Sequence, residues 1–180
     1  MKSVRDERTI LLCGMMGSGK TTVGRSLAAA LGWSFLDSDT LIEERAGRAI
    51  AQIFSTHGEA CFRKLESEVL AELPRQKTVI ALGGGAVLDA TNRERVHETG
   101  TVVWLDASAQ AILERVGAAE DRPLLRGLDA GARLEKLTRL LEERRDAYSQ
   151  AADVRVDTDG LGTEEVRVLV QEQLAAEGLS

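Results

Sequence analysis

Cysteine, histidine and proline are scarce in this chain of 180 residues, with two of each. With so little proline and no short repeat, the sequence cannot form a collagen-like or mucin-like fibre. Cys13 and Cys61 stand far apart and no C-x-x-C pair occurs, which excludes a disulfide framework and a cysteine-based zinc site. We interpret both cysteines, and the histidines His57 and His97, as structural residues.

Long apolar runs and excess positive charge are also missing. No run approaches the ~20 apolar residues that a bilayer span needs, and no signal-peptide cleavage pattern follows the N-terminus. The formal net charge of −6 argues against duplex nucleic acid as a partner, because neutralising phosphates requires a basic surface. We therefore expect a soluble, cytoplasmic protein that binds neither membrane nor nucleic acid.

The chain does have the composition of one folded domain. Hydrophobic residues make up 43% and charged residues 29% of it, which is typical of a globular protein. A chain of this length is also the usual size of a single domain. We predict one domain covering residues 1–180.

Short apolar runs alternate with longer segments of helical periodicity. Strands are predicted for the short runs Thr9–Cys13, Ser34–Leu36, Thr78–Leu82, Thr101–Leu105 and Val154–Val156. Helices are predicted over Lys20–Leu31, Thr40–Ala46, Ile50–Thr56, Glu59–Leu73, Ser108–Val116, Ala132–Ala151 and Thr163–Ala176. This alternation indicates right-handed βαβ units, and hence an α/β fold with a parallel sheet covered on both faces.

A phosphate-binding motif follows the first predicted strand. Residues 14–21 read GMMGSGKT and match G-x-x-x-x-G-K-[ST] in full. Glycines let the backbone bend so that successive N–H groups point inward at a helix N-terminus, where they bind anions. Lys20 would reach the β- and γ-phosphates, and the Thr21 hydroxyl would bind Mg²⁺. The motif predicts a nucleoside triphosphate site.

Other motifs narrow the class of nucleotide-binding protein. A GTP reader usually carries N-K-x-D, but the only asparagine here is Asn92, which arginine follows. An L-S-G-G-Q transporter signature is missing as well, and the chain is short for a helicase. These observations leave small kinases of metabolites or nucleotides.

Polar groups follow the predicted strands, where ligands gather in a parallel sheet. Asp37 and Asp39 follow the second strand, and Gly83–Gly85 follows the third. The aspartates could instead mark a helix start, because Thr40–Glu43 resembles a capping box. Asp106, after the fourth strand, is a second candidate for the acidic residue at the metal, and the sequence does not decide between the two.

A carboxylate lies within an apolar helical stripe. Glu66 falls on the same face as Phe62, Val69 and Leu73, and a buried carboxylate is costly unless it is paired. Arg63 stands three residues earlier, within reach on the same helix. The spacing predicts an Arg63–Glu66 ion pair.

A second arginine, Arg144, projects close to an apolar stripe in the predicted helix Ala132–Ala151. Arg144 points near the centre of the face formed by Leu134, Leu137, Leu141 and Tyr148, whereas Arg145 points toward water. Surface arginines whose stems cover apolar groups would give the same pattern. Beside a phosphate-binding loop, however, Arg63 and Arg144 are candidates for holding a carboxylate substrate by bidentate hydrogen bonds.

Taken in order, these segments resemble the shikimate kinase family. The resemblance runs from about Ile10 to Asp157 and rests on GMMGSGKTTVGR, LDSDTLIE, FRKLE, LGGGAV, RPLL and RRDAYSQAAD. It implies a three-layer P-loop NTPase-type fold with a five-stranded parallel sheet, a substrate-binding region at about 39–73 and a mobile lid at about 117–131. It also implies transfer of the γ-phosphate of ATP to the 3-hydroxyl of shikimate. We expect a monomer.

The resemblance also implies a role for each matching residue. ATP would be bound by Gly17, Ser18, Gly19, Lys20, Thr21, Thr22, Arg115 and the lid residue Arg122. Mg²⁺ would be held by Thr21 and, through water, by Asp37. Shikimate would be bound by Asp39, Arg63, Glu66, Gly83, Gly84, Gly85 and Arg144. Among these, Lys20, Asp39 and Arg122 would be catalytic.

Two departures from the family pattern and two alternatives remain. A proline common in the last helix motif is missing between Arg144 and Tyr148, and the adenine-contacting loop 159–162 also lacks a proline. Gly117, Gly127 and Gly131 are expected flexible points of the lid.

The alternative functions are a kinase of another small hydroxy acid, such as gluconate, and a non-catalytic nucleotide sensor.

Overall fold

The computed structural model describes residues 9–117, 125 and 127–178, and its described part contains a five-stranded sheet. The strands are β1 (Thr9–Cys13), β2 (Ser34–Asp37), β3 (Thr78–Ala81), β4 (Gly100–Asp106) and β5 (Val154–Asp157). All neighbouring pairs are parallel, in the order β2-β3-β1-β4-β5. Each predicted strand is confirmed to within one residue at either end.

The helices between the strands agree less closely with the prediction. They are α1 (Lys20–Leu31), α2 (Ser38–Ala46), α3 (Ile50–Ala71), α4 (Ala90–Thr99), α5 (Ala109–Val116), α6 (Ala130–Ala151) and α7 (Thr163–Ala176), with a 3₁₀ turn at Ala86–Leu88. Two predicted helices join into α3, which is kinked at Gly58, where φ is 78° and ψ is 174°. Helix α4 was not predicted. Across the described residues, no helix combines the length and apolar character needed to cross a membrane.

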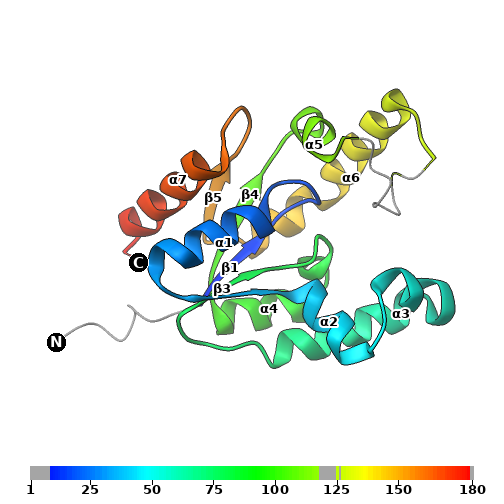
Figure 1. The fold of residues 1–180 in the computed structure, drawn as a ribbon, viewed down its shortest axis with the longest axis horizontal. Coiled ribbons are helices and arrows are strands. Elements are labelled where there is room, and N and C mark those ends of the chain that lie inside the picture. The colour runs from blue at the N-terminus through cyan, green and yellow to red at the C-terminus, as the bar shows by residue number, and fades with distance from the viewer. Residues whose placement is uncertain (1–8, 118–124, 126, 179–180) are drawn as a thin grey trace.

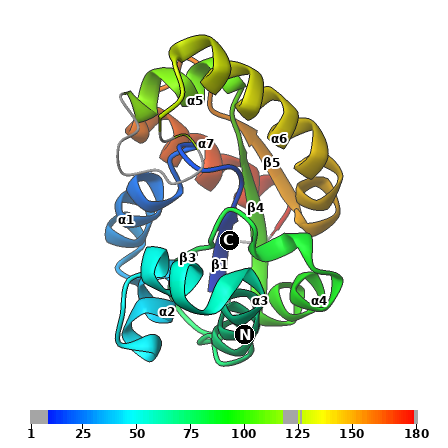
Figure 2. The same cartoon turned by 90° about the vertical axis from the view of Figure 1, so that its right-hand side faces the viewer.

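The core lies on both faces of the sheet. Along β1, Ile10 and Leu12 pack with α1 and α7, whereas Leu11 and Cys13 pack with α3, α4 and the carboxyl end of α6. Successive side chains of a strand point to opposite faces, so one buried strand contributes to two apolar layers. Figures 1 and 2 show the helices around the sheet, with α2 and α3 at the bottom and α5 at the top of Figure 2. The predicted three-layer α/β fold is confirmed.

Two helix starts differ from the prediction. Helix α2 begins at Ser38 rather than Thr40, because the Asp37 carboxylate accepts the Asp39 N–H at 3.1 Å and caps the helix. The alternative that the aspartates mark a helix start is thus confirmed for Asp37, although the cap is Asp37 itself and not a capping box at Thr40–Glu43. Helix α6 also starts early, since Asp129 accepts the Ala132 N–H at 2.8 Å. Gly131 consequently lies in the first turn of α6 and not in a loop.

Candidate active site

The phosphate loop between β1 and α1 depends on glycine. Gly14, Gly17 and Gly19 have φ values of 135°, 74° and 97°, which side chains rarely adopt. A Cβ on Gly14 would also lie 2.5 Å from the Leu105 carbonyl oxygen, and one on Gly17 would lie 2.6 Å from a Val116 methyl group. The loop therefore bends tightly into the start of α1, where backbone N–H groups can bind an anion.

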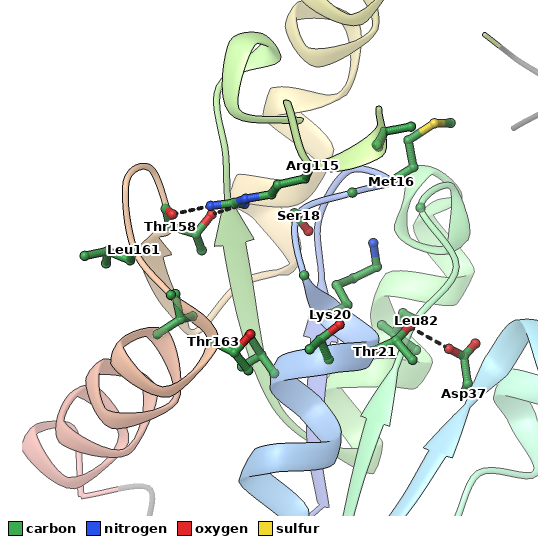
Figure 3. A pocket seen from close by; sticks show the side chains of 18 of the residues that line it. Met16, Ser18, Lys20, Thr21, Asp37, Leu82, Arg115, Thr158, Leu161 and Thr163 are labelled. Atoms are coloured by element: carbon green, nitrogen blue, oxygen red, sulfur yellow. Dashed lines mark hydrogen bonds between the residues drawn. The ribbon is translucent and has the colours of Figure 1, made fainter. Parts of the chain in front are cut away.

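Lys20 places a positive charge beside this loop. Its ammonium group donates to the carbonyl oxygens of Gly14 at 2.9 Å and Met15 at 2.8 Å. Figure 3 shows the side chain rising from the first turn of α1 toward the loop. The backbone dipoles and the ammonium group together favour a polyanion at this position.

Asp37 has two partners at the end of β2. The Thr21 hydroxyl donates to Asp37 Oδ2 at 2.9 Å (Figure 3), while Asp37 Oδ1 caps α2 through the Asp39 N–H. The two interpretations of Asp37, helix cap and site residue, are thus compatible. The competing carboxylate, Asp106, accepts from Arg155 Nε at 3.0 Å and Nη2 at 2.6 Å, and it does not line the cavity beside the phosphate loop.

That cavity has a volume of about 780 Å³, within the range of small-molecule sites. The phosphate loop forms one wall, and the segment from the end of β5 to the first residue of α7 forms another through Thr158, Leu161, Gly162 and Thr163. Arg115 lines the cavity from α5 and is held to the second wall, because its guanidinium donates to the Thr158 hydroxyl at 2.9 Å and to the Thr158 carbonyl (Figure 3). The cavity therefore offers space for a base next to a phosphate site.

Arg63 and Glu66 form the predicted ion pair on α3. Arg63 Nη1 lies 2.7 Å from Glu66 Oε2, and Glu66 is only 1% exposed. Burial raises the pKa of Glu66, with a smaller contribution from Asp39, although Arg63 opposes the shift. Burial is the largest single influence on Arg63 and lowers its pKa, but the hydrogen bonds and charges of Glu66 and Glu59 together outweigh it, so the net shift of the pKa is upward. The pair thus fixes one guanidinium group beside Gly85, at the turn after β3.

The glycine turn Gly83–Gly85 packs directly against these charged groups. The Gly83 N–H donates to the Ser38 hydroxyl at 2.8 Å. A Cβ on Gly83 would lie 2.6 Å from Asp39 Oδ1, and one on Gly85 would lie 2.7 Å from Arg63 Nη1. Only glycine lets the turn approach both the carboxylate and the guanidinium so closely.

Arg144 reaches the same turn from α6. Its Nη1 atom lies 3.4 Å from the Gly84 carbonyl oxygen, which also accepts the Tyr148 hydroxyl at 2.7 Å. Arg144 is half-buried, whereas Arg145 is exposed, so the predicted orientation of the two arginines is confirmed. Arg63 and Arg144 therefore both contact the turn, which contributes Gly84 to the cavity wall.

The predicted residues fall into two adjoining groups. The cavity is lined by Gly17, Ser18, Gly19, Lys20, Thr21, Thr22, Asp37, Asp39, Gly84 and Arg115. The second group is the glycine turn beside the cavity, with Gly83 and Gly85, and the side chains packed around it, Arg63, Glu66 and Arg144. Arg122, the predicted lid residue, lies outside the described residues.

Three contributing residues were not predicted. Ser38 anchors the turn and Thr158 anchors Arg115, and neither contact could be inferred because each joins distant segments. Tyr148 was counted only as an apolar stripe residue. Its signal was present nonetheless, since a buried tyrosine hydroxyl usually has a hydrogen-bond partner.

Sequence comparisons identify the family of the chain. The family model described as shikimate kinase matches residues 16–175. The shikimate kinase of Moorella thermoacetica is 45% identical over 168 residues, covering 93% of this chain and 94% of that protein. The shikimate kinase of Gloeobacter violaceus is 50% identical over 155 residues, covering 85% of each.

Two solved structures resemble this chain to different degrees. The shikimate kinase from Acinetobacter baumannii in complex with shikimate superposes with a TM-score of 0.89 at 37% identity, over 98% of this chain and 97% of that one. A gluconokinase from Sinorhizobium meliloti reaches a TM-score of 0.54 at 18% identity, over 94% and 92%, so it shares the fold alone. With the family model matching most of its length, this chain belongs to the shikimate kinase family.

Proposed function

We propose that this chain transfers the γ-phosphoryl group of ATP to the 3-hydroxyl of shikimate, giving shikimate 3-phosphate and ADP, a step of chorismate and aromatic amino acid biosynthesis. One observation carries the proposal: two arginines from different helices, Arg63 and Arg144, converge on the glycine turn beside the phosphate loop. Paired guanidinium groups recognise a carboxylate well. They would place a carboxylate-bearing acceptor next to the phosphate donor.

On the donor side, we assign the triphosphate to the backbone of Gly17–Thr22 and to the Lys20 ammonium group. Arg115 would pack near the adenine, beside the segment that carries Thr158 and Leu161. Arg122 would close over the phosphates as part of a lid, and this role stays a prediction.

Thr21 and Asp37 fit a Mg²⁺ ion. The Thr21 hydroxyl directs its proton to Asp37, which leaves the oxygen lone pairs available to a cation. In the part of the chain that the structure describes, no cluster of three or more histidine, cysteine or acidic side chains could hold a metal by itself. This suits Mg²⁺, which usually takes few protein ligands and completes its shell with phosphate oxygens and water. When bound, the ion would neutralise charge on the transferring phosphates.

On the acceptor side, Arg63 and Arg144 would bind the shikimate carboxylate. Glu66 would keep the Arg63 guanidinium in place through its 2.7 Å bond. Asp39, at the edge of the cavity, would bind the ring hydroxyls, orient the 3-hydroxyl for attack on the γ-phosphorus and accept its proton as the new P–O bond forms and ADP leaves.

The rate would come from positioning and charge neutralisation, because phosphoryl transfer asks for little covalent chemistry from the protein. Lys20 would stabilise negative charge on the β- and γ-phosphates. Asp39 and the two arginines would hold the hydroxyl in line with the bond that breaks. Excluding water would protect the γ-phosphate from hydrolysis.

A coupled ADP-release assay over a panel of hydroxy acids tests the proposal. We expect turnover with shikimate and little with gluconate, and a phosphorylated shikimate detected by mass spectrometry. Faster turnover of gluconate would favour the hydroxy-acid kinase alternative. Tight ATP binding without any phosphorylated product would instead indicate a nucleotide sensor.

A further inference from the structure

Tyr148 is a fully buried polar side chain for which the proposed chemistry has no role so far. Its ring packs against Trp104, with ring centroids 5.9 Å apart, and its hydroxyl lies 2.7 Å from the Gly84 carbonyl oxygen. Burial raises the pKa of Tyr148 to about 12, although Arg144 opposes the shift. The hydroxyl therefore keeps its proton and donates a hydrogen bond to the Gly84 carbonyl oxygen.

The Gly84 carbonyl oxygen is shared between Tyr148 and Arg144. Arg144 Nη1 lies 3.4 Å away, too far for a strong bond, while the Tyr148 hydroxyl is at an ideal distance. Both donor groups also lie 3.8 Å from the sulfur of Met15, which belongs to the phosphate loop. One turn of α6 thus links the glycine turn to the phosphate loop.

We infer that Tyr148 is a positioning residue that keeps the Arg144 guanidinium available to the substrate carboxylate. The Gly84 carbonyl is half-buried at the cavity wall, and a carbonyl withdrawn from bulk water usually keeps a hydrogen-bond donor. Without the Tyr148 hydroxyl, the charged Arg144 is the nearest replacement, and it would move onto Gly84 and away from the substrate. The inference rests on the proposed function, and Tyr148 acts through Arg144 without touching shikimate.

The variant Tyr148→Phe removes the hydroxyl and keeps the ring. We expect its KM for shikimate to rise about tenfold, the effect of one lost hydrogen bond to a charged group, while its KM for ATP stays within about twofold. Thr9→Val is the matched control, because the buried Thr9 hydroxyl also donates to a carbonyl at 2.7 Å, that of Pro74, at the opposite end of the sheet. It should lower the melting temperature without changing either KM.

A purely structural role would make Tyr148→Phe behave like Thr9→Val, and that result would overturn the inference. A double-mutant cycle sharpens the test. In an Arg144→Ala background, Tyr148→Phe should cause no further rise in the shikimate KM, whereas an additive rise would show that Tyr148 does not act through Arg144.

A measurement on the unsubstituted protein covers the case in which Tyr148→Phe fails to fold. Tyr148 is the only tyrosine in the chain, so 3-fluorotyrosine labelling gives a single ¹⁹F resonance. Shikimate should shift this resonance in the otherwise unsubstituted protein but not in Arg144→Ala, and an unmoved resonance would contradict the inference. Failure of the unsubstituted protein to phosphorylate shikimate would refute the proposed function instead.

Discussion

The two halves of the candidate site are built in different ways. The phosphate side comes from one continuous segment, Gly14–Thr22, and its form depends on backbone conformations that only glycine adopts readily. The acid side is assembled from α3, the turn after β3 and α6, whose residues Arg63, Gly84 and Arg144 are distant in sequence. The phosphate side is therefore formed by neighbouring residues in the sequence, whereas the acid side depends on the fold to bring distant residues together.

This difference predicts different sensitivities. Backbone groups in a short loop keep their positions when distant side chains change. The guanidinium groups on the acid side depend instead on supporting contacts, such as Glu66 for Arg63 and Tyr148 beside Arg144. Substitutions at supporting residues should therefore weaken shikimate binding more readily than ATP binding.

The largest effect should come from Lys20, whose ammonium group lies beside the phosphate loop. Lys20→Ala should lower kcat by a factor of about 10²–10³, the usual cost of removing one donor that stabilises transition-state charge. Lys64→Ala is the control, since Lys64 is highly exposed and pairs weakly with Glu68 at 3.9 Å. Near-normal kcat in Lys20→Ala under saturating ATP would remove Lys20 from the mechanism.

Arg144→Ala tests the acid side with the neighbouring arginine as its control. The KM for shikimate should rise about 100-fold, because a charge-assisted bidentate contact is lost, while the KM for ATP should change little. Arg145→Ala removes an equal charge from the exposed face of α6 and should leave both constants unchanged. Equal effects of the two substitutions would reduce Arg144 to a contributor of general positive charge.

Two glycine substitutions should separate the halves from each other. Gly17→Ala strains the phosphate loop, because φ is 74° and the new Cβ would meet Val116 at 2.6 Å, so it should raise the KM for ATP. Gly85→Ala would press on the Arg63 guanidinium at 2.7 Å and should raise the KM for shikimate about tenfold. Steady-state kinetics with each substrate varied checks both. A rise of both constants in both variants would mean that the halves are not independent.

The smallest effect concerns pH and Glu66. Because burial raises its pKa, Glu66 gains a proton at a higher pH than an ordinary glutamate as the solution is acidified, and Arg63 then loses its anionic partner. The KM for shikimate should therefore rise by a few-fold as pH falls toward this pKa. Glu66→Gln should show a raised KM without this pH dependence. An unchanged pH profile in the variant would assign the titration to another group.

Much of the fold was predictable because its signals are local. The β-branched runs such as Thr101–Leu105 are short and bounded by turn residues, and the glycine motif fixes where α1 begins. Helix α4 was missed because only Val96 among its apolar residues is deeply buried, which leaves no helical stripe to detect. Its start does carry a signal, the Asp89 cap on the Asn92 N–H.

The candidate site was predictable where periodicity and charge act together. Glu66 on an apolar face required a partner, and Arg63 was within reach. The contacts of Ser38 with Gly83 and of Tyr148 with Gly84 join segments that only the folded sheet brings together. Sequence spacing does not predict hydrogen bonds between distant segments. A hydroxyl expected to be buried does indicate that it has some hydrogen-bond partner.

The central claim, that Arg63 and Arg144 recognise a carboxylate beside the phosphate loop, is tested most directly by comparing shikimate with its methyl ester. The ratio of kcat/KM for the two compounds should be about 100 or more in the unsubstituted protein. It should fall toward one in both Arg63→Ala and Arg144→Ala. A protein that turns over the ester as efficiently as the acid would contradict the account.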